Sequence, residues 1–525
     1  MIFCKHYKKW ALLICEMILS SKSRRLASST DQFIPKSARQ KMILPRSSLN
    51  SLSVQAIAEK LATGELSITD LLQACFQRIE LRESQVRAWT YLDMGHAQQQ
   101  ATMWEQKLQQ EGSQILETFP LSGIPIAVKD IFATLEMPTG WGTEIYRNRY
   151  MGYEAAIVSK LKAAGAIILG KTVTTELATA AAGPTANPHN LAHTPGGSSS
   201  GSAAAVADGM VPIALGSQTM GSILRPAAYC GIFGFKPSFG LISRYGMMPV
   251  APVLDHVGIF ARCLNDIHRL LTVLIGTDIR DPDCQTTEQT FSFKTTSLSV
   301  RSTKDFQSIR LGLIKTSHWQ QMESIAQSRL MQAIAVLRQA DIRVDLVSLP
   351  TNVDPYWNIV QTLCAHGLYQ NHGALLSKAP DRCSPLLRDW LQWGRSISAD
   401  TSQQACRWRY RYREQLLPIF AKYDAVLSPV TLGPAPLGLA NTGSPIFCGQ
   451  WTLCGFPALN IPLGKTVDGL PLGCQLVGSL YNDQKLLEIA HQCWAILSPV
   501  FGEITLPPVS LPEGLRRPHK NKEPG

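Results

Sequence analysis

The stretch ALGSQTMGSILRPAAYCG, residues 214–231, combines the residue types that nucleophilic catalysis requires. Ser222 follows Gly221 directly, and a second glycine, Gly216, opens the same segment. Glycines let the backbone approach a substrate carbonyl closely and present the exposed N–H groups that an oxyanion hole needs. An ordinary turn serine fits the same spacing. The residues alone therefore leave two interpretations of Ser222, a nucleophile beside backbone donors or a structural turn.

A second serine cluster occupies residues 195–209, PGGSSSGSAAAVADG. Residues 197–201 match G-x-S-x-G, which in α/β-hydrolases holds a nucleophilic serine on the turn between a strand and a helix. The preceding segment NPHNLAHTP is typical of a loop rather than a strand. From spacing alone, serines that cap a helix beginning near Ser202 are therefore favoured over a hydrolase elbow.

A third pattern, GAIILGKT at residues 165–172, matches the phosphate-binding loop G-x-x-x-x-G-K-[ST]. That chemistry requires a flexible loop whose N–H groups surround the phosphates. The four variable positions here are Ala-Ile-Ile-Leu, which favour a buried strand. Nucleotide binding is therefore disfavoured.

The segments around these motifs predict an α/β fold. Residues 53–83 predict two helices, the second with a capping box formed by Ser67 and Asp70. The run IPIAVKDIFAT, residues 124–134, predicts a buried strand that Lys129 interrupts. Two further segments each predict a helix, a glycine stop and a short strand, with stops at Gly165 and Gly209; the first strand is expected at residues 166–169.

The rest of the body predicts no division into domains. The pattern loosens between residues 280 and 400 and returns to strands with a final helix at 449–495. Neither a strong linker nor an internal repeat interrupts the body, so we expect one large domain.

The formal charge of +11 lies mostly at the two ends of the chain. Ten basic against two acidic residues give +8 over residues 1–47, and residues 513–525 carry +2, which leaves +1 for the body. A near-neutral body argues against a basic nucleic-acid face. The segment CRWRYRYRE, residues 406–414, interleaves arginines with aromatic residues, and a solvated helix is favoured there over a nucleic-acid platform.

The cysteines and histidines predict neither disulfides nor a metal site. The 13 cysteines include no C-x-x-C pair, which suits a reducing, cytoplasmic compartment, and the 11 histidines form no H-E-x-x-H motif. No apolar run is long enough for a membrane helix. The basic N-terminal segment imitates a signal or transit peptide only loosely. We expect a disordered extension there, or a start assigned too early, with Met42 as the true start.

In order along the chain, the lysine-containing strand, GGSSSGS and GS-x-T-x-GSILRPAAYCGIFGFKP resemble the amidase signature family. GAIILGKTVTTELA, GPTANPHN, LDHVGIFARCLNDI and GFPALNIPLGKTVDGLPLGCQLVG extend the resemblance over roughly residues 50–500. It implies a single layered α/β/α domain with a mixed central sheet over residues 48–512. A basic extension, 1–47, and a basic tail, 513–525, would flank that domain.

The resemblance also implies a catalytic triad: Ser222 as nucleophile, Ser198 as bridging serine and Lys129 as base. The chemistry is coherent, because a serine hydroxyl needs a neutral base within reach. A lysine serves only if its pKa falls from about 10.4 toward 7–8, which burial in an apolar strand provides. The structural alternative is a lysine that extends from a strand end to solvent.

Further site features follow from the same resemblance. A cis peptide is expected at Gly197–Ser198, and Ser199 or Ser200 is expected to support Ser198. The oxyanion hole would consist of backbone N–H groups from Thr219, Met220, Gly221 and Ser222. No cofactor and no metal are expected.

Three positions depart from the TDTGGSIR form of the A subunits of tRNA-dependent amidotransferases. Gln218 replaces the acidic residue and Met220 a glycine, and Arg225 lies one position later than the motif arginine. If Met220 has a positive φ it is strained; if not, its thioether narrows the acyl pocket. Arg225 either clamps a substrate carboxylate or satisfies loop carbonyls. Gln218 and the later position of Arg225 predict a closer relation to stand-alone amidases than to the A subunits. Met220 replaces the glycine that is usual in the whole family, and it predicts an active enzyme with altered acyl selectivity.

The sequence therefore predicts an amidase that cleaves an amide C–N bond through an acyl-enzyme and releases ammonia or an amine. One alternative is a glutaminase-type A subunit of an amidotransferase complex. The other is a catalytically impaired relative with a binding role. The expected partner is a small-molecule amide substrate, without nucleic acid or membrane, and a homodimer is left open.

Overall fold

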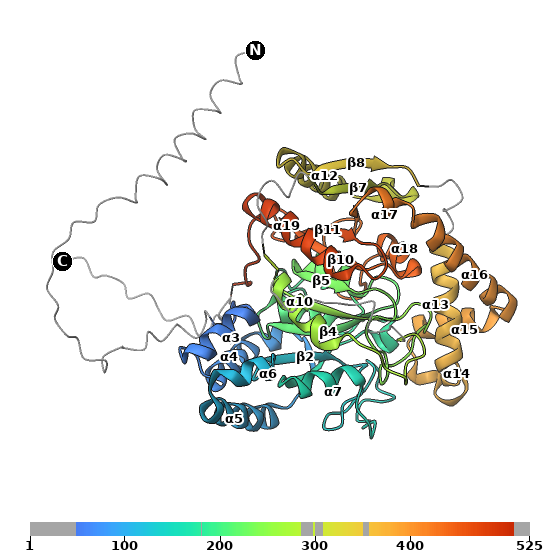
Figure 1. The fold of residues 1–525 in the computed structure, drawn as a ribbon. Coiled ribbons are helices and arrows are strands. Elements are labelled where there is room, and N and C mark those ends of the chain that lie inside the picture. The colour runs from blue at the N-terminus through green and yellow to red at the C-terminus, as the bar shows by residue number, and fades with distance from the viewer. Residues whose placement is uncertain (1–48, 180, 285–297, 300–307, 350–355, 509–525) are drawn as a thin grey trace, which may run out of the picture. The chain divides into compact units, whose positions relative to one another are not determined.

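The computed structural model describes residues 49–179, 181–284, 298–299, 308–349 and 356–508, and its fold is drawn in Figure 1. The two basic segments predicted at residues 1–47 and 513–525 lie outside the described residues. The described chain contains one eleven-stranded sheet. Helices pack against both of its faces, which confirms the predicted α/β architecture.

The sheet is mixed, with the strand order β1-β3-β2-β4-β6-β5-β10-β11-β9-β7-β8. Strands β3, β2 and β4 run parallel, as do β9, β7 and β8, and the other neighbouring pairs are antiparallel. The bounds of the strands are β1 Trp89–Leu92, β2 Pro125–Lys129, β3 Ile167–Thr172, β4 Ile213–Gln218, β5 Phe233–Lys236, β6 His256–Ala261, β7 Arg310–Ile314, β8 Arg343–Val347, β9 Ala425–Pro429, β10 Ala458–Lys465 and β11 Pro471–Val477.

Alternate residues of β5 show that the helices form two layers. Phe233 packs edge-on against Trp494 of α19, with ring centroids 5.2 Å apart. The next residue, Gly234, faces Ala227 of α9. Because successive strand residues point to opposite faces, α9 and α19 cover opposite faces of the sheet. The α-helices are α3 Val54–Thr63, α4 Ile68–Val86, α5 Met94–Glu111, α6 Ile115–Thr118, α7 Ala156–Ala163, α8 Ser200–Ala207, α9 Leu224–Cys230, α10 Leu264–Leu274, α12 Ser324–Gln339, α13 Tyr356–His372, α14 Leu375–Lys378, α15 Pro385–Ser396, α16 Ala399–Leu416, α17 Ile419–Lys422, α18 Ile446–Cys454 and α19 Asp483–Phe501.

Local signals correctly predict several element boundaries. The Ser67 hydroxyl accepts the N–H of Asp70 at 2.9 Å and so begins α4, as the capping box predicts. Gly165 has a φ of +94° between α7 and β3, the left-handed conformation that glycine tolerates.

Strand β3 runs to Thr172, beyond the predicted end at Leu169, so the GKT residues lie in a strand and not in a phosphate-binding loop.

The arginine-rich segment 406–414 lies in α16, and it is only partly solvated. Arg407 and Arg411 are exposed, as a solvated helix predicts. Arg409 is buried, and its Nε donates to the carbonyl of Leu453 at 3.2 Å. Arg413 Nε donates to the Cys454 carbonyl at 2.6 Å. These two arginines therefore bind the last carbonyls of α18, a contact that a fully solvated helix does not make.

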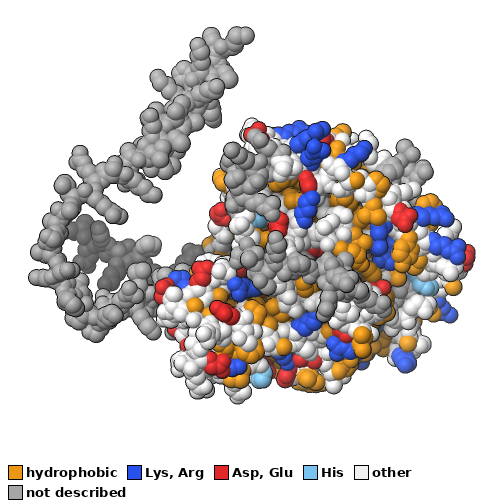
Figure 2. Space-filling view, in the orientation of Figure 1, with side chains coloured by type: hydrophobic (Ala, Val, Ile, Leu, Met, Phe, Trp, Pro, Cys, Tyr) orange, Lys and Arg blue, Asp and Glu red, His pale blue; other side chains and the backbone are white. Residues whose placement is uncertain are grey.

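The surface bears charges of both signs. Figure 2 shows acidic and basic side chains interspersed on the face drawn, in keeping with the near-neutral body. Among the described helices, none has the length and apolar character needed to cross a bilayer. Within the described residues, every cysteine is a free thiol and no cluster of acidic, histidine and cysteine side chains could hold a metal ion.

Candidate active site

The candidate site lies at the edge where β2 and β4 end. These parallel neighbours pair Val128 with Leu215, so Lys129, the last residue of β2, lies beside the end of β4. A short loop, residues 219–222, leaves β4 and leads toward α9; we call it the oxyanion loop. The carboxyl edge of parallel strands is where α/β proteins commonly bind their ligands.

Lys129 is buried between two serine hydroxyls. Its side chain is fully inaccessible, and its Nζ lies 2.8 Å from Oγ of Ser198 and 2.9 Å from Oγ of Ser217. Burial lowers the pKa of Lys129 well below its usual value, while the negative charge of Asp255 acts in the opposite direction. An amine held by neutral partners in an apolar strand is the arrangement that a lysine base requires.

The neighbouring buried lysine shows why Lys129 is distinct. Lys171 of β3 is equally buried, but its Nζ lies 3.1 Å from the carboxylate of Asp130 and donates to the Thr139 hydroxyl at 2.7 Å. The Asp130 charge favours the protonated amine of Lys171, against the effect of burial on its pKa. Lys171 is therefore an ion-paired structural lysine. It is the lysine of the G-K-T match, so in this chain that lysine binds a carboxylate of the protein itself.

The serine cluster does not cap α8, so the interpretation favoured by spacing is wrong. The helix begins at Ser200, and Ser199 at its N-cap position makes no capping hydrogen bond. The Ser199 hydroxyl donates instead to the carbonyl of Ser217 at 3.2 Å, and that of Ser200 to the carbonyl of Val173 at 3.3 Å. The hydroxyls thus fasten the segment to β4 and to the residue after β3, beside the expected bridging serine. The peptide bond Gly197–Ser198 is cis, as the resemblance implies.

The oxyanion loop presents unused backbone donors. Among the described residues, the N–H groups of Thr219, Met220, Gly221 and Ser222 have no hydrogen-bond acceptor. Ser222 is 7% exposed, and its hydroxyl has no hydrogen-bond partner in the described part of the chain. The loop can therefore provide both a nucleophile and donors for an oxygen that carries developing negative charge.

Two neighbouring positions of this loop have different requirements. Met220 does not have a positive φ, so the methionine causes no left-handed strain. At Gly221 an added Cβ would lie 2.7 Å from Cβ of Pro445. Glycine is required there because the backbone packs closely against the start of α18, not because of its φ.

Asp255 holds the first residue of the oxyanion loop by a hydrogen bond. It accepts the Thr219 hydroxyl at 2.6 Å and the N–H groups of Val250 and Ala251 at 2.9 and 3.0 Å. Burial raises the pKa of its carboxyl group, and these hydrogen bonds oppose that shift. Asp255 thereby anchors the first residue of the loop and places a negative charge near Lys129.

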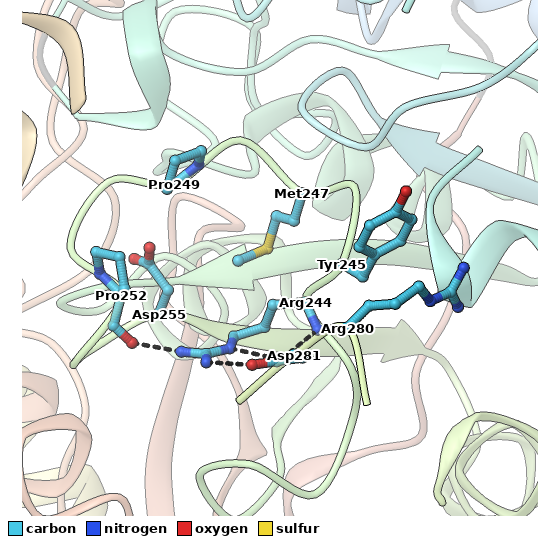
Figure 3. A pocket seen from close by; sticks show the side chains of 8 residues that line it. All are labelled: Arg244, Tyr245, Met247, Pro249, Pro252, Asp255, Arg280 and Asp281. Carbon is cyan, nitrogen blue, oxygen red and sulfur yellow. Dashed lines mark hydrogen bonds and ion pairs between the residues drawn. The ribbon is translucent and has the colours of Figure 1, made fainter. Parts of the chain in front are cut away.

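A cavity of about 150 Å³ adjoins Asp255 (Figure 3). Arg244 crosses it and is held by the Asp281 carboxylate, at 2.6 Å from Nη2 and 2.9 Å from Nε. Figure 3 shows the Asp255 carboxylate on the cavity wall, above this arginine. Asp255 therefore separates the oxyanion loop from a small, arginine-lined cavity. The lining residues are Arg244, Tyr245, Met247, Pro249, Pro252, Asp255, Arg280 and Asp281.

Arg225 binds the backbone at the start of the serine cluster. It is 6% exposed; its Nη1 donates to the Gly443 carbonyl at 2.6 Å, and its Nη2 donates to the carbonyl of Gly197. Of the two roles considered for Arg225, this geometry favours the binding of loop carbonyls over a carboxylate clamp. Arg225 thus holds the carbonyl of Gly197, the residue directly before Ser198.

The sequence interpretation missed two site residues, Ser217 and Asp255. Ser217 occupies the second-to-last position of β4, and its contact with Lys129 depends on pairing between strands distant in sequence. Asp255 follows Leu254 and precedes a wholly buried strand, β6. A charge within an apolar run drew attention to Lys129 before the resemblance gave it a role, and the charge of Asp255 beside an apolar run is a similar signal.

Comparison with known proteins identifies the family. Residues 70–487 match the family model described as Amidase. The chain is 32% identical over 483 residues to the A subunit of the glutamyl-tRNA(Gln) amidotransferase of Desulfatibacillum aliphaticivorans, covering 84% of this chain and 96% of that protein. The corresponding protein of Endomicrobium trichonymphae is 30% identical over 471 residues, with 83% and 95% covered.

Solved structures with the same fold include both kinds of enzyme. Peptide amidase from Stenotrophomonas maltophilia is 27% identical with a TM-score of 0.74, covering 86% of this chain and 98% of that one. The A subunit of the glutamyl-tRNA(Gln) amidotransferase from Thermotoga maritima is 25% identical with a TM-score of 0.71, covering 88% and 98%.

These similarities do not support the expectation of a closer relation to stand-alone amidases, because the curated relatives described above are amidotransferase A subunits. That expectation rested on a few positions on either side of one loop, whereas the similarity to the A subunits extends along most of the chain. With a matching family model over residues 70–487 and the single mixed-sheet domain of its structural neighbours, the chain belongs to the amidase family of amidohydrolases.

Proposed function

We propose that the protein hydrolyses a carboxylic amide through a covalent acyl-enzyme, with Lys129, Ser198 and Ser222 as the catalytic residues. The observation that carries this proposal is the position of Lys129, which is fully buried and within 2.8 Å of the Ser198 hydroxyl. Burial lowers the pKa of this amine, which makes its neutral, proton-accepting form more accessible than that of a solvated lysine.

The reaction would proceed in two halves. Ser222 Oγ attacks the amide carbon while its proton passes through Ser198 to Lys129, and N–H groups of residues 219–222 bind the resulting oxyanion. The proton then returns to the amide nitrogen, the C–N bond breaks, and ammonia or an amine leaves. Water attacks the ester of Ser222 with the same proton relay, which releases the acid and regenerates the serine.

The substrate best supported by the relatives is the side-chain amide of glutamine. The curated relatives belong to glutamyl-tRNA(Gln) amidotransferases, and each is similar to this chain over more than nine-tenths of its own length. By this likeness the protein would release ammonia from glutamine for use by a partner protein. The second candidate is a stand-alone amidase, favoured by Gln218 at the end of β4, by the later position of Arg225 and by the likeness to peptide amidase.

Ammonia release distinguishes these candidates. Purified protein and the Ser222→Ala variant would be compared on glutamine and on aliphatic, aryl and carboxylated primary amides, with and without candidate partner proteins. Release from glutamine only with a partner supports the amidotransferase role, and turnover by the protein alone supports a stand-alone amidase. Intact protein that is not acylated even by a reactive ester would contradict both and favour a binding role.

Arg225→Lys tests the role of the buried guanidinium. A lysine can reach one of the two carbonyls that Arg225 binds, so the backbone before Ser198 loses support. We expect kcat to fall about 10-fold for neutral and acidic amides alike, since a buried charge-assisted hydrogen bond is worth about 1.5–3 kcal/mol. An increase in KM confined to acidic amides would instead indicate a carboxylate clamp.

Met220→Gly tests the acyl pocket. Because Met220 is free of left-handed strain, its thioether would act by narrowing the space beside Ser222. We expect kcat/KM for bulkier acyl groups to rise about 10-fold, the effect of one or two methylene-sized groups in a pocket. Met220→Ala, which adds no glycine flexibility, serves as the control, and an unchanged order of substrates would contradict the assignment.

A further inference from the structure

Helix α18 forms a wall against which the oxyanion loop packs. A Cβ atom on Gly221 would lie 2.7 Å from Cβ of Pro445 and 3.1 Å from Cβ of Cys448. Close-packed surfaces of this kind transmit displacement, because no gap separates them. The position of α18 therefore affects the position of the loop backbone.

Thr452 connects α18 to the loop by hydrogen bonds. It is fully buried, and its hydroxyl accepts Nε2 of Gln218 at 2.9 Å and donates to the carbonyl of Met220 at 3.0 Å. The carbonyl of Cys448, one helical turn earlier, lies 3.1 Å from the same hydroxyl and competes for its proton. One hydroxyl thus joins the strand end before the loop to the middle of the loop.

The side chain of Gln218, the residue before the loop, also reaches the residues that follow it. Its Oε1 accepts the N–H groups of Ile223 and Leu224 at 2.8 and 3.1 Å, where α9 begins. A carboxylate could also accept these two N–H groups, but it has no donor for Thr452. In this chain the glutamine therefore needs a buried acceptor, and Thr452 provides it.

The Thr452 contact also fixes the orientation of one peptide group. In a trans peptide the carbonyl oxygen and the following N–H point in opposite directions, and the bond between Met220 and Gly221 is not cis. Because Thr452 holds the Met220 carbonyl toward α18, the N–H of Gly221 points away from that helix.

We propose that Thr452 is a positioning residue for the oxyanion hole, which acts through the Met220 carbonyl to aim the Gly221 N–H at the developing oxyanion. This inference rests on the proposed serine mechanism, since that mechanism is what creates the oxyanion. Thr452 itself would touch neither substrate nor reacting atoms. Its contribution would lie in the transition state, where the hydrogen bond from Gly221 strengthens.

Thr452→Val removes the hydroxyl and keeps the side-chain shape. We expect kcat to fall about 10- to 100-fold with KM changed by less than about twofold, as for a partial loss of one oxyanion donor. Thr452→Ser restores the hydroxyl and should bring kcat to within about threefold of the wild type. Thr185→Val is the matched control, because that buried hydroxyl donates to the Arg87 carbonyl instead and should leave kcat unchanged.

A fluorophosphonate probe gives a second measurement that needs no amide substrate. Ser222 Oγ bonds to phosphorus, fluoride leaves, and the serine proton passes to the Lys129 relay, while the phosphoryl oxygen occupies the oxyanion hole. The second-order rate constant for labelling should fall by about the same factor in Thr452→Val. If that variant does not fold, Gln218→Glu tests the same contact, because its carboxylate draws the Thr452 proton away from Met220 and should also slow labelling.

The outcomes separate this inference from the proposed function. A wild type that neither turns over amides nor reacts with the probe would overturn the serine mechanism and the positioning role together. A reactive wild type with equal rates in Thr452→Val would overturn the positioning role alone. A failure of Thr452→Ser to rescue, or a loss confined to the melting temperature, would assign Thr452 a purely structural role.

Discussion

Ser222→Ala is expected to reduce ammonia release by roughly ten-thousand- to a million-fold, the scale on which serine hydrolases lose activity without their nucleophile. The hydroxyl of Ser222 has no other hydrogen-bond partner among the described residues, so the substitution leaves no partner unsatisfied. The melting temperature should therefore stay within about 1 °C of the wild type, since the substitution removes one atom and breaks no hydrogen bond within the described residues.

Active-site labelling completes this test. Wild-type protein should form a covalent adduct with a fluorophosphonate at Ser222, visible as one added phosphonyl group by intact mass, and the alanine variant should not. An adduct that maps to Ser198 or Ser199 would show that the nucleophile lies elsewhere in the serine cluster. Activity retained in Ser222→Ala would exclude the mechanism altogether.

Lys129→Met is expected to lower kcat by about 10³- to 10⁴-fold, at the upper end of what a general base contributes, and to raise the melting temperature. Both effects have one cause, because Lys129 is buried with hydroxyl partners and its pKa is lowered well below the usual value. Folding thus disfavours the charged amine. An apolar chain of similar length removes that cost together with the base.

The stability gain should depend on pH with a definite sign. At pH values between the lowered folded pKa and the unfolded value of about 10.4, the unfolded state binds more protons at Lys129, so wild-type stability rises with pH. The advantage of Lys129→Met should therefore be largest at neutral pH or below and should shrink toward about pH 10. Melting curves at several pH values measure this difference, and an advantage that grew with pH would contradict it.

Lys171→Met is the matched control for Lys129→Met. It removes an equally buried lysine but leaves the Asp130 carboxylate without its cation. Breaking a buried ion pair in this way costs about 3–5 kcal/mol, so the melting temperature should fall. Opposite shifts in the two variants would establish that the partners of each lysine, and not burial alone, determine its effect.

Local sequence signals predicted the parts of the fold that depend on local chemistry. The Ser67 cap and the Gly165 stop are interactions between residues close in the chain, and both occur as expected. The strand at Lys129 follows from its apolar run. The end of β3 was predicted too early because a lysine such as Lys171 normally indicates that a buried strand has ended. Its burial depends on Asp130 of the neighbouring segment, which no local pattern reveals.

The same limit explains the misjudged serines and arginines. Ser199 and Ser200 look like capping residues, but their acceptors are carbonyls of Ser217 and Val173, which the sheet brings close. Arg409 looks solvated on its own helix, yet it binds the end of α18. Arg225 could not be assigned from spacing for the same reason. The grouping of Lys129, Ser198 and Ser222 came from the family resemblance alone; of these three, the structure joins Lys129 and Ser198 by a hydrogen bond.

The close contact between Gly221 and α18 also bears on how this enzyme could diversify. No side chain fits at that position, whereas the adjacent Met220 is only partly buried and has ordinary backbone geometry. Random substitution followed by selection for new amides should thus retain glycine at position 221 and accept many residues at position 220. Gly221 would then stay constant while position 220 varies, so that the substrate preference could change without loss of the catalytic residues.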